Sequence, residues 1–436
     1  MLKFIMPLMI CVVMLSWGET LIYILFIMFI FLLFKPTMMN SALINFELDF
    51  FSWSLIMLSF WVISLAIMSS IKNKTSNKMS IIYLSTMVTL LMFLVLTFSI
   101  SNNMTFYLLF ESCLIPILLM ILGWGYQPER TQAGVYMLFY TIFGSLPLLI
   151  MVLQYTMTTG SNYMFFTTSV FTGFMSTVCL SAAFLVKFPM YSVHLWLLKA
   201  HVEAPVAGSM ILAGVLLKLG GFGLIRMLSL LDYDYTLLKE LIISVSIWGG
   251  LLVSINCLRY MDMKLLIASS SVVHMSTCIT ALFIMTEWSV KGCLLMMIAH
   301  GICSSGLFSL ANMAYERTNS RSMLVTKGLL NLTPMISLWW FLMLASNMAA
   351  PPSINLAGEI MLLMSLISWN SVMMIPLLLL GFFSASYSIY LYSLSQHGSF
   401  NKMKMSLLNN TSLEYLVLLL HWLPMNFFIL AVMFML

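Results

Sequence analysis

Hydrophobic residues form long continuous runs along the whole chain, and short polar stretches separate them. Most runs are about 20 residues long, which is the length a helix needs to cross the hydrocarbon core of a bilayer. Transmembrane β-strands would instead alternate apolar and polar residues over about ten positions. A helix also satisfies its backbone hydrogen bonds within one segment, as lipid requires. The pattern therefore predicts an all-α polytopic membrane protein.

The runs predict about fourteen transmembrane helices, of which the twelfth is counted once although it looks broken. Their expected limits are 2–16, 20–35, 50–70, 80–100, 104–123, 133–154, 173–200, 206–227, 236–257, 264–285, 289–312, 329–370, 372–395 and 413–435.

Proline interrupts two of these segments. One carries Lys-Phe-Pro at 187–189, and the other carries two prolines at 351–352. Proline removes a helix hydrogen bond and clashes with the preceding turn, so we predict two discontinuous helices. The breaks lie in the seventh and twelfth spans, and this odd offset of five makes corresponding helices run in opposite directions, as in inverted-repeat transporters. We therefore predict one transmembrane bundle over 1–436, with inverted-repeat halves at 80–227 and 236–395. Ordinary proline kinks are the alternative interpretation.

Composition supports the membrane assignment. The 436 residues are 62% hydrophobic and 8% charged, and the mean hydropathy of +1.04 excludes an ordinary soluble protein. The net charge of +5 is small and no basic patch carries interleaved aromatics, so nucleic-acid binding has no support. The seven cysteines are scattered through apolar segments without a CxxC pair, so neither a zinc site nor an iron–sulfur cluster is indicated.

Basic residues predict the orientation of the bundle. Alternate connections on one side hold 12 of the 19 lysines and arginines, whereas five belong to the other side. The positive-inside rule predicts such an asymmetry and supports the span count. Both termini should then lie on the side away from the translating compartment. The twelve are Lys72, Lys74, Lys78, Arg130, Lys199, Arg259, Lys264, Arg317, Arg321, Lys327, Lys402 and Lys404.

Four ionisable residues lie within the expected spans: Glu111, Lys187, Lys218 and Glu359. A charge at bilayer depth costs roughly 2.5 to 3.5 kcal/mol on insertion scales, and such residues usually face a bundle interior or a water path. Two charges of each sign favour a route for protons or ions. The alternative is a set of ion pairs that only lock helices together.

Two histidines, His274 and His300, also lie deep in apolar segments between Lys218 and Glu359. Histidine titrates near physiological pH and can pass a proton between its ring nitrogens. The alternative role is a hydrogen bond between helices. The glycines around Lys218 permit close helix approach or a locally loosened backbone. They do not form a phosphate loop, because GxxxxGK[ST] is missing.

The segment 194–205 is unusually polar for a membrane protein. His194 and His201 are seven residues apart, so one helix face would carry both. No partner cluster has the spacing of metal ligands, so we predict no metal site. A proton uptake region or a charge-linked joint is the favoured interpretation.

Several of these motifs closely resemble the chain 4 family of mitochondrial NADH–ubiquinone oxidoreductase, over nearly the whole chain. The His-Val-Glu-Ala-Pro block at 201–205 and the Pro-Pro-Ser-Ile-Asn-Leu block at 351–356 resemble this chain rather than its antiporter-like sister chains. The stretches that carry the resemblance are Gly123–Arg130, Lys187–Pro189, His194–Met210, Leu217–Gly221, Ala299–Gly306, Tyr315–Arg317 and Pro351–Glu359.

The resemblance implies a fourteen-helix antiporter-like bundle in the inner mitochondrial membrane, and proton translocation driven by quinone reduction elsewhere in the assembly. It implies that Glu111 and Lys187 form an ion pair, that Lys218 is the central relay lysine, and that His274 and His300 link it to Glu359. Glu359 would be the exit-side glutamate on the second broken helix. Leu198 departs from the family, which usually has proline there.

The resemblance also implies the partners and cofactors. NADH, FMN, the iron–sulfur clusters and ubiquinone would belong to other subunits of the assembly, and this chain would bind no cofactor. Its partners would be those subunits, including sister antiporter-like chains, and membrane lipids. The alternatives are a subunit of a multisubunit cation/proton antiporter and a membrane scaffold that transports nothing.

Overall fold

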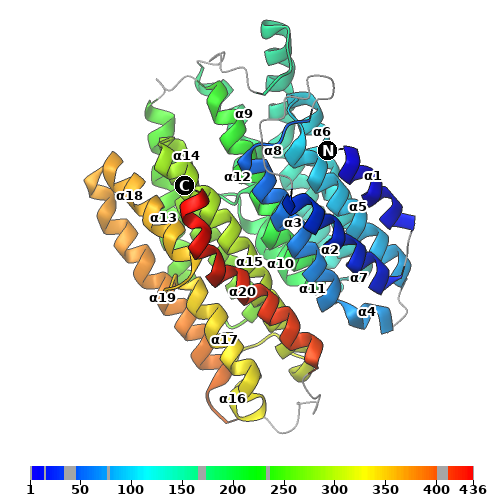
Figure 1. The fold of residues 1–436 in the computed structure, drawn as a ribbon. Coiled ribbons are helices and arrows are strands. Elements are labelled where there is room, and N and C mark those ends of the chain that lie inside the picture. Colours follow the sequence, from blue (N-terminus) through cyan, green and yellow to red (C-terminus); the bar gives the residue numbers. More distant parts are fainter. Residues whose placement is uncertain are drawn as a thin grey trace. The chain divides into compact units, whose positions relative to one another are not determined.

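The computed structural model describes residues 2–13, 16–33, 46–75, 79–164, 173–231, 236–399 and 411–435. These residues fold almost entirely into helices (Figure 1), and their only extended pairings are three isolated bridges. Each of the fourteen expected segments coincides with a helix or a group of short helices. The all-α prediction is therefore confirmed.

Contacts divide the chain into two compact units. Unit 1 comprises Met1–Phe188 and Glu203–Leu238, and unit 2 comprises Pro189–Val202 and Lys239–Leu436. The boundary after Leu238 lies close to the expected boundary between the halves. The halves themselves and their inverted relation remain predictions.

The helices of unit 1 are α1 (Leu2–Val13), α2 (Trp17–Leu33), α3 (Phe50–Ser69), α4 (Ile71–Thr75), α5 (Ser80–Ser99), α6 (Asn103–Ser112), α7 (Leu114–Trp124), α8 (Arg130–Thr159), α9 (Phe174–Lys187), α11 (Val206–Ile211), the π-helix η1 (Leu212–Leu216), α12 (Leu217–Met227) and the 3-10 turn η2 (Leu228–Leu230).

The helices of unit 2 are α10 (Leu195–Glu203), α13 (Thr236–Cys257), α14 (Met263–Ile284), α15 (Glu287–Thr318), α16 (Leu329–Leu332), α17 (Pro334–Asn347), α18 (Ile354–Trp369), the 3-10 turn η3 (Ser371–Met373), α19 (Met374–Gln396) and α20 (Ser412–Met435). The first residues of α13 and the last residue of α10 belong to unit 1.

Among the described residues, ten helical segments are long and apolar enough to cross a membrane. The remaining four expected spans are α1, α2 and the two interrupted segments. Helix α15 forms the core of unit 2, because all residues of its apolar stretch are buried. In the apolar stretch at α19, only 22% of the residues are buried. We infer that α19 faces lipid or a partner chain, since its exposed side chains are apolar.

Both predicted helix breaks are confirmed. Helix α9 ends at Lys187, and the backbone of Phe188 is extended before Pro189. Helices α17 and α18 are separated by the segment that contains Pro351 and Pro352. In each case the proline lacks the N–H that would continue the helix, so the chain leaves the helical path beside a charged residue.

Two departures from regular helices were not expected from the sequence. The expected span 104–123 divides at Cys113 into α6 and α7. Pro116 explains this division, because its missing N–H would otherwise bond to the carbonyl of Ser112. The expected span 206–227 contains the π-helix η1 directly before Lys218.

The orientation rests on the charge comparison and remains a prediction. Lys35, Lys78, Lys402 and Lys404, which entered that comparison, lie outside the described residues.

Candidate functional site

The Lys187 side chain is buried in unit 1, with 3% of its surface exposed. Its ammonium donates a hydrogen bond of 2.6 Å to the Phe110 carbonyl oxygen and lies 3.0 Å from the centre of the Phe110 ring. Phe110 is in the last turn of α6, where backbone carbonyls have no N–H partner within the helix. The α6–α7 break therefore supplies a carbonyl and an aromatic face that together solvate the buried cation.

Glu111 follows Phe110 directly and lies near enough to attract Lys187 electrostatically. Its Oε1 atom is buried without a hydrogen-bond partner. The family resemblance implies an ion pair between these two residues. The structure places both in unit 1, and the ion pair itself stays a prediction. A carboxylate oxygen buried in this way is free to accept a proton or a water molecule.

Lys218 lies at the start of α12 and is fully buried. Its ammonium donates a hydrogen bond of 2.6 Å to the carbonyl oxygen of Ala213, within the π-helix η1. A π-helical turn is a local departure from regular helix geometry that frequently marks functional sites. The residue pattern gave no signal for this turn, because leucine, alanine, glycine and valine also form ordinary helices.

Glycines bring α12 against α9. A Cβ atom at Gly220 would lie 2.6 Å from the Phe188 nitrogen, and one at Gly223 would overlap the Phe184 ring. Only glycine therefore allows this separation between the two backbones. The close approach expected from the glycine run is confirmed, and it packs the helix of Lys218 against the end of the helix that carries Lys187.

In unit 2, His274 on α14 contacts Glu359 on α18. The His274 Nδ1 atom is 3.4 Å from Glu359 Oε1, and the two side chains are 5% and 29% exposed. The His300 ring on α15 lies 5.7 Å from the His274 ring, centroid to centroid. Three residues that the sequence singled out separately are thus neighbours within one unit.

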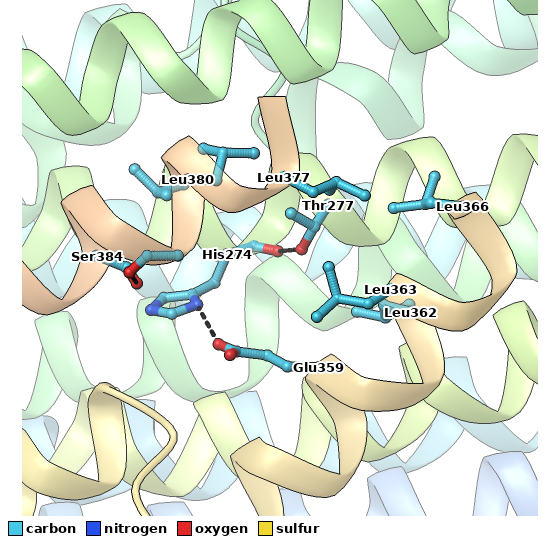
Figure 2. A pocket seen from close by; sticks show the side chains of 11 residues that line it. His274, Thr277, Glu359, Leu362, Leu363, Leu366, Leu377, Leu380 and Ser384 are labelled. Atoms are coloured by element: carbon cyan, nitrogen blue, oxygen red, sulfur yellow. Dashed lines mark hydrogen bonds and ion pairs between the residues drawn. The ribbon is translucent and has the colours of Figure 1, made fainter. Parts of the chain in front are cut away.

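A pocket lies beside the His274–Glu359 pair, between α14, α18 and α19 (Figure 2). Five of its eleven lining residues are leucines, and its polar side chains are His274, Thr277, Glu359 and Ser384. Figure 2 shows His274 and Glu359 turned toward one another at one side of the pocket. An apolar lining around a few convergent polar groups is typical of a binding or transfer site.

One residue of this cluster was missed. The Tyr387 hydroxyl on α19 is 3.3 Å from His274 Nε2, and Tyr387 is fully buried. Tyr387 is one of three tyrosines near the end of α19, and in sequence these resemble the tyrosines that anchor helix ends at the membrane interface. Its spacing of three residues from Ser384, which lines the pocket, places both on one face of α19.

The prediction that one helix face carries His194 and His201 is wrong. His194 lies in the turn before α10, where its Nδ1 atom is 3.1 Å from the Tyr191 carbonyl oxygen. His201 lies on α10 and stacks on Phe308 at 4.9 Å. The helix begins one residue later than that spacing requires. In the described part of the chain, no group of three or more metal-ligating side chains could hold a metal ion.

The six candidate relay residues divide between the units. Glu111, Lys187 and Lys218 belong to unit 1, and His274, His300 and Glu359 belong to unit 2. In unit 1, Glu111 lies near Lys187. In unit 2, His274 lies beside both Glu359 and His300.

Two family models match the chain. The model described as NADH:quinone oxidoreductase/Mrp antiporter, TM, matches residues 100–385. The model described as NADH-ubiquinone oxidoreductase chain 4, amino terminus, matches residues 1–97. Together they cover most of the residues that carry the fold and all six candidate relay residues.

Relatives and a solved structure agree with these matches. The chain is 51% identical over 383 residues to NADH-ubiquinone oxidoreductase chain 4 of Ceratitis capitata, covering 88% of this chain and 86% of that one. It is 44% identical over 437 residues to the Locusta migratoria protein of that name, covering 98% and 96%.

The fold is similar to that of a chain in a structure described as respiratory complex I from Thermus thermophilus with bound NADH. The TM-score is 0.86 at 20% identity, and the match covers 98% of this chain and 95% of that chain. The fold, the two family models and the relatives therefore agree, and this chain belongs to the NADH-ubiquinone oxidoreductase chain 4 family.

Proposed function

We propose that this chain is a proton-translocating membrane subunit of the respiratory NADH:ubiquinone oxidoreductase. The observation that carries the proposal is the contact of Glu359 with His274 inside apolar helices, at a distance from which a proton can pass between them. Membership of the NADH-ubiquinone oxidoreductase chain 4 family supports the assignment of this chain to the respiratory assembly. The relay residues are Glu111, Lys187, Lys218, His274, His300 and Glu359.

Each relay residue has a role that its surroundings support. Phe110 stabilises the charged form of Lys187, and Glu111 attracts the Lys187 ammonium. Neutralisation of either Glu111 or Lys187 therefore removes the attraction that stabilises the charge of the other. Lys218 is held by the carbonyl of Ala213. His274 can take a proton at one ring nitrogen and release another at the other. Burial excludes bulk water, so that protons pass between fixed groups.

Electron transfer from NADH to ubiquinone belongs to other subunits in this proposal, as do FMN and the iron–sulfur clusters. This chain binds none of these groups and contributes no redox centre. Its partners are those subunits, the sister antiporter-like chains and membrane lipids. The exposed apolar side chains of α19 support such a lateral contact.

The chain resides as a multi-pass protein in the mitochondrial inner membrane, with both termini on the intermembrane-space side. The names of the insect relatives support this location. The excess of basic residues on alternate connections supports the orientation, because basic connections stay on the side of translation.

Replacement of Lys218 by alanine in the assembled enzyme of a tractable relative tests the relay. We expect pumping during NADH oxidation to fall by about tenfold or more, since a positioned acid–base group contributes at least that much. Lys72, an exposed residue on α4, provides the matched control as Lys72→Ala. Unimpaired pumping in the Lys218 variant, at normal assembly, would exclude the role assigned to Lys218.

A second candidate function is a subunit of a multisubunit cation/proton antiporter. The description of the family model that matches 100–385 includes such antiporters, and this observation favours it. Mass spectrometry of the native assembly separates the two functions. Flavin and iron–sulfur subunits in the assembly support the respiratory enzyme, and their absence supports the antiporter. Normal proton stoichiometry after neutralisation of Glu111, Lys187, Lys218 and Glu359 together would instead identify a scaffold.

A further inference from the structure

We propose that Tyr387 is a positioning residue that fixes the ring orientation and the protonation pattern of His274. The proposal rests on the proposed relay and adds a residue to it. Tyr387 is fully buried on α19, and its hydroxyl is 3.3 Å from the Nε2 atom of His274. Glu359 lies on the opposite side of the same ring, 3.4 Å from Nδ1.

The two contacts occupy both nitrogens of one imidazole. A neutral imidazole has one N–H donor and one acceptor nitrogen, and the partner of each decides which form is present. When the Tyr387 hydroxyl donates to Nε2, the proton of His274 must lie on Nδ1, where it points at Glu359. In this state the hydroxyl favours the form of His274 whose Nδ1–H faces Glu359, and that proton passes to the carboxylate only after Nε2 has taken up another.

The same hydroxyl also serves the other states of the ring. A proton that reaches Nε2 produces the imidazolium, and the Nδ1 proton can then pass to Glu359 to give a carboxylic acid and a neutral ring. That ring carries its proton on Nε2. A tyrosine hydroxyl both donates and accepts, so it can rotate to accept from Nε2–H and keep the ring in place.

On the described elements, the side-chain hydrogen bond of the Tyr387 hydroxyl is to His274. The ionisable groups that act on it electrostatically are Cys257, Glu359 and Cys303, in addition to the histidine that it contacts. His274 in turn faces Glu359 and His300. Phenylalanine would fill the same volume, so a hydroxyl at this buried position has a polar function rather than a packing one.

The test is Tyr387→Phe in the assembled enzyme, reconstituted in vesicles, with NADH-driven proton uptake and quinone reduction measured over a range of pH. We expect pumping to fall by about threefold to tenfold, the contribution of one hydrogen bond. We also expect the pH profile of pumping to change, because the ring loses its hydrogen-bond partner at Nε2.

Tyr390→Phe is the matched control. Tyr390 lies one turn further along α19, and its exposed hydroxyl contacts the Met261 sulfur at 3.7 Å. Loss of activity through packing alone would lower assembly without moving the pH profile. An unchanged rate and pH profile in Tyr387→Phe would overturn the proposal, provided that His274→Ala abolishes pumping. Normal pumping in His274→Ala would instead refute the proposed relay itself.

Discussion

The Lys187 ammonium contacts Phe110 twice, through the backbone carbonyl oxygen and through the ring. This arrangement depends on the break at Cys113, which places Phe110 in the last turn of α6. Carbonyls at a helix C-terminus lack intrahelical partners and carry a partial negative charge, so they favour a cation. A discontinuous helix thus supplies the solvation that lipid cannot.

Phe110→Leu tests this solvation. Leucine keeps an apolar side chain and the backbone carbonyl, but it removes the aromatic face. A desolvated cation–π contact contributes about 1 to 2 kcal/mol, which corresponds to about a fivefold to thirtyfold change in the population of the charged Lys187. We expect the number of protons pumped per NADH to fall while quinone reduction per assembled enzyme stays near normal.

Phe106→Leu is the control for that experiment. Phe106 lies one turn earlier on α6 and packs against Phe110 and Phe184, so the change removes a similar ring from the same aromatic cluster. We expect it to lower stability without a specific loss of pumping. Equal losses of pumping in the two variants would show that aromatic packing, and not the contact with Lys187, is responsible.

Gly220→Ala tests the close packing of α12 on α9. The added Cβ would meet backbone atoms, 2.6 Å from the Phe188 nitrogen and 3.0 Å from the Phe184 carbonyl oxygen, and neither can rotate away. Overpacking of this kind costs about 1 to 3 kcal/mol. We expect a lower thermal transition of the assembled enzyme. Gly18→Ala on α2, where a Cβ meets nothing within 4 Å, should leave the transition unchanged.

Equal stability of Gly220→Ala and Gly18→Ala would contradict the requirement for glycine at position 220. The glycines would then be permissive positions in a helix rather than requirements of the α9–α12 contact.

The sequence predicted those features that depend on long apolar runs and on proline. All fourteen segments, the break after Lys187 and the break at 351–352 follow from hydrocarbon thickness and from the missing proline N–H. The sequence also identified His274 and Glu359, because an ionisable residue in an apolar run is conspicuous. The contact between these two residues needed the structure, since 84 intervening residues separate them in the chain.

Features that depend on packing between helices could not be predicted. The π-helix η1 consists of residues that also form ordinary helices. The hydrogen bond from Lys218 to the Ala213 carbonyl oxygen is known only from the structure. Tyr387 carries no local signal that separates a buried hydroxyl from an interfacial one. His194 was misplaced because helix periodicity does not give the first residue of α10.

Glu359→Gln tests whether the carboxylate beside His274 acts as a proton acceptor or only as a hydrogen-bonding group. Glutamine keeps the length of the side chain and an oxygen acceptor, but it cannot take up a proton at neutral pH. We expect pumping to fall by about tenfold or more, with a stability close to that of the wild type. Proton uptake into vesicles during NADH oxidation measures the effect.

The control is Glu287→Gln at the exposed first turn of α15, where the carboxylate only complements the helix N-terminus. We expect this change to lower the free energy of unfolding by about 1 kcal/mol at most. Retention of full pumping by Glu359→Gln would assign Glu359 a structural role and remove it from the relay.

The ion pair between Arg317 on α15 and Glu414 on α20 gives the last prediction. The Arg317 Nη2 atom is 2.7 Å from Glu414 Oε2, and the two side chains are 7% and 18% exposed. Removal of one partner leaves a buried charge unpaired, which costs about 3 to 5 kcal/mol for a fully buried pair. Glu414 is partly exposed, so we expect Glu414→Ala to cost about 2 to 3 kcal/mol.

The double variant Arg317→Met, Glu414→Leu should recover most of this loss, because apolar replacement of both partners leaves no charge to desolvate. Thermal denaturation of the assembled enzyme measures both changes, and pumping per assembled enzyme should remain normal in each. If the double variant were less stable than Glu414→Ala alone, the pair would contribute net attraction beyond the cost of burying its charges. The attachment of α20 to α15 would then depend on that attraction rather than on the apolar contacts between the two helices.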